Sequence, residues 1–286
     1  MNKDICSILS FYAISPIHAG SGASVATVDL PIQRERHTGY PHIQASSVKG
    51  AMRDHFRQNN KEDKKLVNNI FGSDEQDGWS NKEETIPGLI SVSDAKLLAF
   101  PMRSNIAPFV WVTSPTIMNR LKRDLEYIGM KIDKNFEAKG EKAKILVGNV
   151  SESRIILEDI VVKLDDHNPI QVDFIKEHFP DVERLLLISD EMFDYCVSSC
   201  TEIQTNIKID SEMGTAKEGG LRYQEFLPSD SVLYSVVYFS SRSNDLQALN
   251  IKQYLQDSIN RFLQIGGDVT LGKGVCKVNW IDGVTK

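Results

Sequence analysis

Residues 231–281, SVLYSVVYFSSRSNDLQALNIKQYLQDSINRFLQIGGDVTLGKGVCKVNWI, predict a strand, an amphipathic helix and a second strand in succession. The run 231–239 is rich in valine and aromatic residues, which is typical of a strand. A glycine-rich loop separates the helix from the predicted last strand, 275–281. Within 249–263, apolar side chains recur at helical spacing and share one face: Ile251, Tyr254, Leu255, Ile259, Phe262 and Leu263.

The same order of elements occurs in the first third of the chain. An apolar run at 5–14 predicts a strand, and a second strand is predicted at 89–100. Between them, Ser46 and Ser47 are suited to cap a helix whose buried side carries Val48, Met52 and Phe56. Two strand–helix–strand units predict an α+β fold with a ferredoxin-like core.

The remaining segments are interpreted as decorations of one domain, 1–286. Insertions are expected at roughly 15–45, 59–87 and 130–200, and the polar stretch 59–87 is predicted to be a solvated loop. Strand 109–112 is followed by Ser114–Pro115, which starts a helix, and the middle mixes short helices with strands at 145–150 and 154–164. Residues 203–226 predict a long hairpin with turn-rich DSEMGTAKEGG between its strands.

Composition limits the class of protein. The 286 residues are 25% charged and 41% hydrophobic, which is a globular balance, and the formal net charge is −6. Any nucleic-acid site must therefore be a local patch. The four cysteines form no CxxC pair, which indicates neither a disulfide framework nor a zinc site. No signal peptide or membrane-spanning run is visible, so we expect a cytoplasmic protein with no membrane partner.

One local basic stretch stands out. Residues 31–65 hold eight Lys/Arg and four Asp/Glu, a balance of +4 within the acidic chain. Ser46, Ser47 and Lys49 at a helix N-terminus offer hydroxyls, backbone N–H groups and an ammonium to a phosphate. Arg53 follows Lys49 by one helical turn, so the pair is suited to track a nucleic-acid backbone. A capped helix with a solvated basic face is the commoner meaning of such a motif.

The loop 266–274 is the second candidate binding segment. Its four glycines allow close approach to a phosphodiester, and Lys273 adds a positive charge. The loop follows a helix and precedes a strand, which is the reverse of the order in a dinucleotide or P-loop motif. A helix C-cap and tight connection explain one of these glycines, but not all four.

For catalysis, Asp29 is notable because it follows a flexible GSGASVATV run and precedes Leu30–Pro31. RNA carries its own nucleophile, the ribose 2′-OH, so one carboxylate that orients or deprotonates it, or holds Mg²⁺, is sufficient chemistry. His18 is suited to act as an acid toward the leaving oxygen or to contact phosphate. From sequence alone, a turn-forming aspartate and an ordinary loop histidine are the more common interpretations.

Three motifs together resemble a known family. VDLPIQRERHTGYPHIQASSVKGAMRDHF (28–56), GTAKEGGLRYQEFLP (214–228) and IGGDVTLGKGVCKV (265–278) are similar to motifs of the backbone subunit of Cmr-type (type III-B) CRISPR effector complexes. That subunit is a member of the RAMP (repeat-associated mysterious protein) superfamily. The similarity runs in order along nearly the whole chain, except for 59–87 and 130–200.

The resemblance implies a guide-RNA-binding subunit with an RNA-recognition-motif-like palm and a thumb hairpin at 203–226. It implies that several copies form a helical filament along a CRISPR guide RNA, together with other Cmr subunits. It also implies that complementary target RNA is cleaved at regular intervals. Cleavage in that family depends on a divalent metal, Mg²⁺ or Mn²⁺, and leaves a cyclic phosphate. The matching catalytic position is Asp29, and His18 and Glu225 match residues near that site. The RNA-binding positions implied are Ser47, Lys49, Gly50, Arg53, Gly272 and Gly274, and Lys273 is added to them for its positive charge in the same loop.

Other functions stay open at this stage. The chain is alternatively an architectural RNA-binding subunit without nuclease activity, as in a type III-A sibling. A guide-processing endonuclease of the same superfamily would usually depend on a histidine-centred site, and the loop acid is the better match. A metabolic enzyme is disfavoured because no nucleotide, zinc or nucleophile motif is found.

Overall fold

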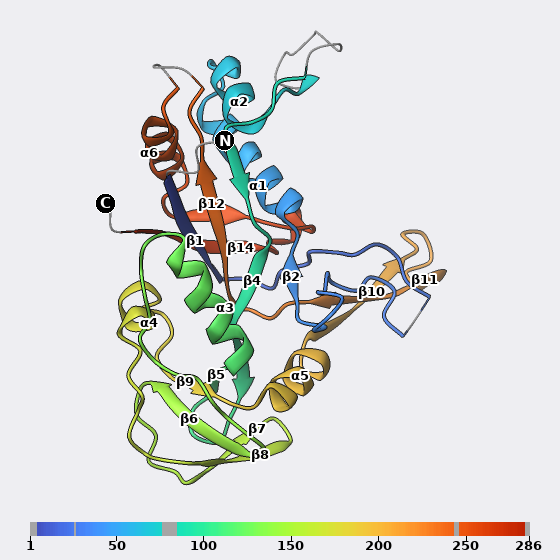
Figure 1. Cartoon of the computed structure of the whole chain (residues 1–286). Coiled ribbons are helices and arrows are strands. Elements are labelled where there is room, and N and C mark those ends of the chain that lie inside the picture. Colours follow the sequence, from blue (N-terminus) through green and yellow to red (C-terminus); the bar gives the residue numbers. More distant parts are fainter. Residues whose placement is uncertain (1–4, 26, 76–84, 243–245, 284–286) are drawn as a thin grey trace.

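The computed structural model of the chain describes residues 5–25, 27–75, 85–242 and 246–283. In this part of the chain the fold is mixed α/β, with one large sheet and a separate two-stranded hairpin (Figure 1). The large sheet has twelve strands, and its buried apolar side chains form a contiguous core. No described helix is long and apolar enough to cross a bilayer.

The centre of the large sheet is built from the two predicted strand–helix–strand units. Its strands lie in the order β14 (Val275–Asp282), β1 (Ile5–Ala13), β12 (Val232–Phe239) and β4 (Ala95–Arg103), and all neighbours are antiparallel. Helices α1 (Ala45–Asn59) and α6 (Ala248–Ser258) connect them and contact each other. The sequence prediction is confirmed for the order of these elements.

Two helix boundaries differ from the prediction. Helix α6 ends at Ser258, and Phe262 and Leu263 lie instead in β13 (Phe262–Gln264), which pairs with β14. Strand pairing therefore takes precedence over the helical spacing there, and Phe262 is exposed. At α1 the N-cap is Gln44 and lacks a side-chain bond, so Ser46 and Ser47 lie inside the first turn. Val48, Met52 and Phe56 are buried as predicted.

The predicted solvated loop at 59–87 is wrong for its first part. Helix α2 (Lys64–Phe71) is capped by the Asp63 side chain and buries Val67, Ile70 and Phe71. The Phe71 ring lies 5.7 Å from that of Phe56, so α2 packs on α1 and extends the core. Residues 76–84 of the predicted loop lie outside the described residues. The predicted strand 89–100 is divided into β3 (Ile90–Val92) and β4.

The middle of the chain extends the same sheet beyond β4, in the order β5, β9, β6, β8 and β7. Ser114 accepts a hydrogen bond from Ile117 N and Pro115 opens α3, which confirms the predicted helix start. The predicted strand 154–164 is a hairpin with its turn at Glu158. The elements of this region are β5 (Phe109–Thr113), α3 (Pro115–Glu126), β6 (Lys142–Val147), β7 (Arg154–Leu157), β8 (Ile160–Leu164), α4 (Asp173–His178), β9 (Leu185–Leu187) and α5 (Asp190–Ser199).

The predicted hairpin is confirmed as β10 (Glu202–Ile209) and β11 (Ala216–Phe226), which project from the body of the molecule (Figure 1). Ile207 pairs with Leu221, so both side chains lie on one face. Both are about half exposed. The base of β11, unlike its tip, is buried, and it meets the loop before the short strand β2 (His42–Ile43).

Candidate functional site

Asp29 is fixed to the base of the hairpin by main-chain and side-chain hydrogen bonds. Its Oδ2 accepts from Tyr223 N at 2.7 Å, and the Tyr223 carbonyl accepts from the N–H groups of Asp29 and Leu30, both at 3.1 Å. Among the described residues, Asp29 Oδ1 has no hydrogen-bond partner, and the residue is partly exposed. This oxygen can therefore accept a proton or a hydrogen bond from a ligand.

His18 lies beside the same strand. Its Nδ1 is 2.8 Å from the carbonyl oxygen of Glu225. Because a carbonyl only accepts, Nδ1 carries the proton, and Nε2 is the acceptor of the neutral ring. A Cβ added at Gly20 would lie 2.7 Å from Nε2, so a larger residue at position 20 would displace the imidazole from its present place.

Glu225 is buried, and its carboxylate is satisfied within the protein. Oε1 accepts from Arg34 Nη2 at 2.6 Å and from Thr201 Oγ1 at 2.8 Å, while Oε2 accepts from Ile32 N at 3.0 Å. A carboxylate that is only 7% exposed and holds three donors is suited to fix the surrounding chain.

The glycine-rich loop closes over His18 from the other side. Gly266 has φ +90°, and a Cβ there would lie 2.5 Å from the His18 carbonyl oxygen, which also accepts from Gly267 N at 2.9 Å. The short 3₁₀ turn η2 (Val269–Leu271) follows, and Asp268 accepts from Gln224 Nε2 of β11. Loop and hairpin base are thus tied together.

Gly272, Lys273 and Gly274 are the predicted binding residues of this loop, and the backbone angle φ of both glycines lies in the left-handed region that favours glycine. Gly274 has φ +73°, donates to the Pro16 carbonyl at 2.8 Å, and is so close to the Ile265 carbonyl oxygen that a Cβ would collide with it. Lys273 Nζ lies 4.9 Å from the centre of the Phe226 ring, whose centre is 5.5 Å from that of His18. Gly272 has φ +72° and open space around it.

These segments border a groove of about 760 Å³, here called the main groove. Ser47 and Gly50 of α1 line it opposite His18, and a Cβ at Gly50 would meet nothing within 4 Å. The described residues that line it are His18, Ala19, Gly20, Gly22, Leu30, Gln33, Ser47, Gly50, Ala51, Asp54, His55, Gln58, Gln264, Gly266, Gly267 and Val269.

Lys49 and Arg53 do not line the main groove. Lys49 Nζ donates to the Ile90 carbonyl at 3.3 Å, and burial, followed by the nearby Arg53 charge, lowers the pKa of Lys49. Arg53 donates to Asn68 Oδ1 at 3.2 Å and lies 3.7 Å from Asp74 Oδ2. The structure therefore separates the two predicted backbone contacts from Ser47 and Gly50, which occupy another face of α1.

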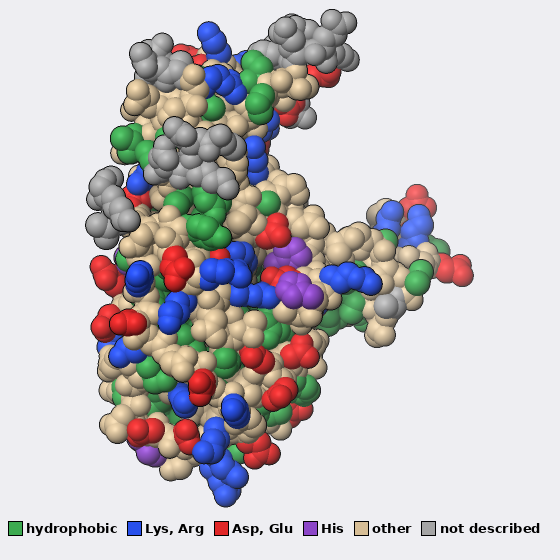
Figure 2. Space-filling model, in the orientation of Figure 1, with side chains coloured by type: hydrophobic (Ala, Val, Ile, Leu, Met, Phe, Trp, Pro, Cys, Tyr) green, Lys and Arg blue, Asp and Glu red, His purple; other side chains and the backbone are tan. Residues whose placement is uncertain are grey.

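A second groove, of about 570 Å³, lies on the other side of the Asp29 segment. Val28 and Pro31 line this second groove whereas Leu30 lines the main groove, so the segment that carries Asp29 runs between the two. The second groove is bordered by hydroxyl groups, by Arg34 and by Glu225. Figure 2 shows Lys, Arg and His side chains, with Asp and Glu among them, gathered at the foot of the projecting hairpin.

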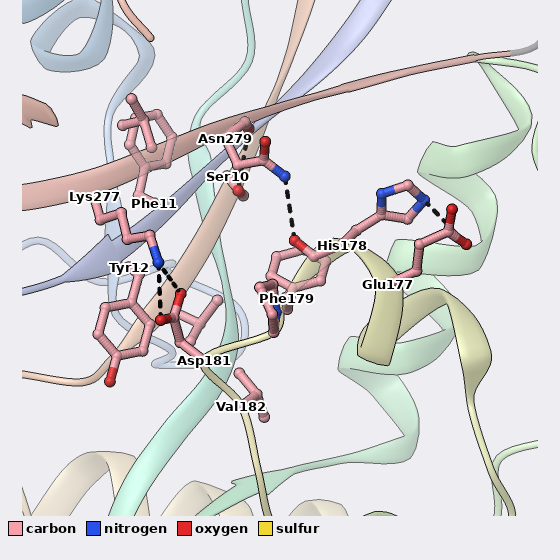
Figure 3. Close-up of a pocket in the computed structure, with 13 residues that line it drawn as sticks. Ser10, Phe11, Tyr12, Glu177, His178, Phe179, Asp181, Val182, Lys277 and Asn279 are labelled. Atoms are coloured by element: carbon pink, nitrogen blue, oxygen red, sulfur yellow. Dashed lines mark hydrogen bonds and ion pairs between the residues drawn. The ribbon is translucent and has the colours of Figure 1, made fainter. Parts of the chain in front are cut away.

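A third cavity, of about 320 Å³, contains none of the predicted site residues. It lies between β1, β14 and the segment that ends α4 (Figure 3). Lys277 donates to both carboxylate oxygens of Asp181 at 2.9 Å, and Asn279 donates to the His178 carbonyl at 3.4 Å. Burial lowers the pKa of His178. These contacts join the middle region to the central strands.

The described residues contain no group of three or more His, Cys, Asp or Glu side chains placed to hold a metal ion. Asp29 Oδ1 is a single oxygen donor at the site. Mg²⁺ commonly binds through one or two carboxylates plus substrate phosphates and water, so this donor fits a cation shared with RNA.

Comparison with known proteins decides the family. The model of the RAMP superfamily matches residues 10–277. A curated relative, "CRISPR system Cmr endoribonuclease Cmr4" of Pyrococcus furiosus, is 38% identical over 285 residues, covering 95% of this chain and 94% of the relative. The chain belongs to the Cmr4 family of the RAMP superfamily. A Cmr4 subunit of Saccharolobus solfataricus is 27% identical, with 94% of both chains covered.

Solved structures agree with the Cmr4 family assignment. Oligomeric Cmr4 from Pyrococcus furiosus superposes with a TM-score of 0.73 at 29% identity, covering 98% of this chain and 99% of that one. A type III-B Cmr-beta complex bound to cognate target RNA contains a chain that matches with a TM-score of 0.78 at 26% identity, covering 96% of each chain. The large sheet and hairpin are therefore those of Cmr4 structures.

Sequence reasoning missed two features of this Cmr4-family site. Tyr223 holds Asp29 through its backbone, and main-chain contacts of this kind leave no side-chain signature in a sequence. Arg34 lay within the quoted motif but was counted only as one base among eight. Its ion pair with Glu225 joins residues 191 positions apart, and no local pattern indicates such a pair.

Proposed function

We propose that this chain is the guide-RNA-binding backbone subunit of a type III-B CRISPR complex. We further propose that it cuts complementary target RNA with Asp29 as the catalytic residue. The observation that carries the proposal is the unpartnered Asp29 Oδ1 in the segment between two grooves, with Asp29 and His18 both bonded to β11. A relative at 38% identity bears the name endoribonuclease, which supports cutting by this chain itself.

The chemistry needs few protein groups. Asp29 Oδ1 accepts the proton of a ribose 2′-OH as that oxygen attacks the adjacent phosphorus. The P–O5′ bond breaks, leaving a 2′,3′-cyclic phosphate and a 5′-hydroxyl. A protonated His18 donates from Nε2 to the leaving O5′, while the hydrogen bond from Nδ1 to the Glu225 carbonyl fixes the ring.

We propose a divalent cation, Mg²⁺ or Mn²⁺, for this site. Asp29 Oδ1 would hold this ion as the alternative to accepting the 2′-OH proton, and phosphate oxygens and water would supply the other ligands. Such an ion neutralises charge that develops on the phosphate. The ion is thus expected to bind together with RNA.

The grip on guide RNA is assigned to the palm. Strand order β14–β1–β12–β4 with α1 and α6 supports the proposal of a ferredoxin-like, RNA-recognition-motif-like palm within one decorated domain, and β10–β11 is proposed to be its thumb. Ser47, Gly50, Gly272, Lys273 and Gly274 are proposed to contact the RNA backbone. Specificity then comes from base pairing between guide and target, so the protein needs no base-reading contacts.

Assembly places many such sites along one RNA. Copies of this chain, together with other Cmr subunits, are proposed to form a filament on the guide. The oligomeric Cmr4 structure of Pyrococcus furiosus supports self-association. Each copy contributes one Asp29, so cuts are expected at a constant interval.

The first prediction concerns Asp29→Asn in the reconstituted complex with guide RNA, Mg²⁺ and end-labelled target. The amide cannot take the 2′-OH proton, so the ladder of evenly spaced products is expected to disappear, with a rate loss of at least about a hundredfold. Target binding, measured by gel shift, is expected to persist. An unchanged ladder would make the chain an architectural subunit and assign cutting to another protein.

A further inference from the structure

We infer that Arg34 is a positioning residue for cleavage, acting through Glu225 on both Asp29 and His18. The inference rests on the function proposed above. It also assigns Glu225 a positioning role, because its buried carboxylate already holds three donors of the protein, Arg34, Thr201 and Ile32.

The guanidinium of Arg34 joins three separate parts of the chain. Nη2 donates to Glu225 Oε1 at 2.6 Å, and Nη1 donates to the carbonyls of Val197 and Gly39, both at 3.0 Å. These acceptors lie at the base of β11, in α5 and in the turn before β2. Arg34 thus connects the hairpin base to the body of the protein.

Glu225 passes this restraint to the site through its main chain as well as its carboxylate. Its N–H donates to the Leu30 carbonyl at 3.0 Å, next to Asp29. Its carbonyl accepts from His18 Nδ1 at 2.8 Å, and Oε2 holds Ile32 N. One buried residue therefore holds the segment that carries Asp29 and the ring of His18.

Removing the guanidinium leaves the Glu225 carboxylate buried without its cationic partner. A buried charge that loses its partner is strongly unfavourable, so the side chain is expected to protonate or to move toward water in the second groove. Either response disturbs the hydrogen bonds to Ile32 and Thr201 and displaces the adjoining main chain. A shift of about 1 Å in a catalytic group costs about a hundredfold in rate.

The geometry favours arginine over lysine at this position. Two different nitrogens serve the carboxylate and the two carbonyls at once, and the planar fork fixes their directions. A lysine ammonium supplies the charge from one nitrogen only. Arg34→Lys is therefore expected to retain part of the stability without recovering the full cleavage rate.

The ion pair between Arg120 and Glu35, the residue that follows Arg34, offers a matched control. Arg120 Nη1 lies 2.8 Å from Glu35 Oε2, and the two side chains are 18% and 16% exposed. This pair is about as buried as Arg34–Glu225, whose side chains are 25% and 7% exposed. Neither Arg120 nor Glu35 has a hydrogen bond to Asp29, Leu30 or His18 among the described residues.

The test compares Arg34→Ala, Arg34→Lys and Arg120→Ala in the reconstituted complex. Single-turnover cleavage is measured at saturating target, together with the Kd for a target that carries 2′-deoxy linkages at the cut sites. We expect Arg34→Ala to lose about ten- to a hundredfold in rate with its Kd within about threefold of wild type. Millimolar guanidinium ion is expected to restore part of that rate, and Arg120→Ala is expected to stay within about threefold of wild type in both quantities.

A second arm keeps the inference testable if Arg34→Ala folds poorly. Glu225→Gln removes the charge that Arg34 balances, so the double variant Arg34→Ala/Glu225→Gln is expected to melt higher and cut faster than Arg34→Ala. A double variant that is slower than either single variant would overturn the coupling. Wild-type cleavage in a folded Arg34→Ala complex would also overturn the inference, as would a parallel loss of target affinity, which indicates a direct RNA contact.

The result also separates this inference from the proposed function. If Asp29→Asn still cuts, the function fails and the inference fails with it. If Asp29→Asn is inactive while Arg34→Ala cuts normally, the function stands and only the positioning role is wrong.

Discussion

Gly272 and Gly274 share a backbone conformation but differ in their surroundings. Their φ angles are +72° and +73°, in the left-handed region that disfavours side chains. Around Gly272 there is open space, whereas the carbonyl oxygen of Ile265 occupies the place of a Cβ at Gly274. Ile265 N also donates to the Gly274 carbonyl at 2.9 Å, so the loop cannot shift there without losing that bond.

Alanine at the two positions is therefore expected to have unequal effects. Gly272→Ala is expected to cost about 1 kcal/mol of unfolding free energy through backbone strain alone. Gly274→Ala adds a backbone collision and is expected to cost about 3 kcal/mol or more. Urea unfolding of both variants beside wild type measures the difference, and equal losses would contradict the role assigned to Ile265.

Element boundaries show where sequence patterns are sufficient. Strong apolar runs predicted β1 and β12, and Ser114–Pro115 predicted the start of α3. Helix α2 was missed because its polar flanks hide an apolar face that becomes buried only against Phe56 of α1. Spacing alone could not say that Lys49 and Arg53 turn toward β3 and α2 rather than toward the main groove.

In the site, too, local motifs predicted some residues, whereas others depend on contacts between distant parts of the chain. Asp29, His18 and the glycine loop were identified from motifs, and the structure brings them together at the hairpin base. Their common support, the base of β11, could not be predicted because Tyr223 and Glu225 act through main-chain atoms across about two hundred positions. Glu225 was placed near the site by resemblance, but only its partners Arg34, Thr201 and Ile32 reveal how its carboxylate is used.

At the end of α4, His178 gives the fold a defined pH dependence. Its Nε2 is buried without a hydrogen-bond partner in the described structure, and the nearest carboxylate oxygen, on Glu177, is 4.0 Å away. Burial lowers the pKa of His178 below its unfolded value near 6.5. The unfolded chain then binds the proton first, so the contribution to stability is complete above about pH 6.5 and is lost as the pH falls toward the folded pKa.

His178→Phe is expected to remove this contribution while keeping a ring against Phe174, whose centre lies 4.6 Å from that of His178. Unfolding free energies measured by urea at pH 5, 6, 7 and 8 are expected to fall less steeply toward acid in the variant than in wild type. The other histidines are common to both proteins, so only the difference between the curves is informative. Parallel curves would show that His178 does not titrate on unfolding.

The whole molecule is acidic, and so its main groove has to bind RNA mostly through uncharged groups. The chain carries a net charge of −6, yet the proposed ligand is a polyanion. None of the described residues that line the main groove is Lys or Arg. The groove instead offers glycine backbone, hydroxyl and amide groups, with Lys273 in the adjoining loop. Contacts of this kind position a backbone without displacing many counterions.

The salt dependence of RNA binding tests this balance directly. Each single-strand phosphate neutralised by a cation contributes a slope of about −0.7 in log affinity against log salt, so binding through Lys273 alone predicts a slope of about −0.7 per copy. Fluorescence anisotropy with a short single-stranded RNA between low and moderate salt measures that slope for the isolated chain. The variant Lys273→Gln is expected to bring it close to zero. A slope of about −3 or steeper in wild type would instead mean that Lys and Arg residues outside the main groove, within the stretch 31–65 of net charge +4, bind the RNA phosphates.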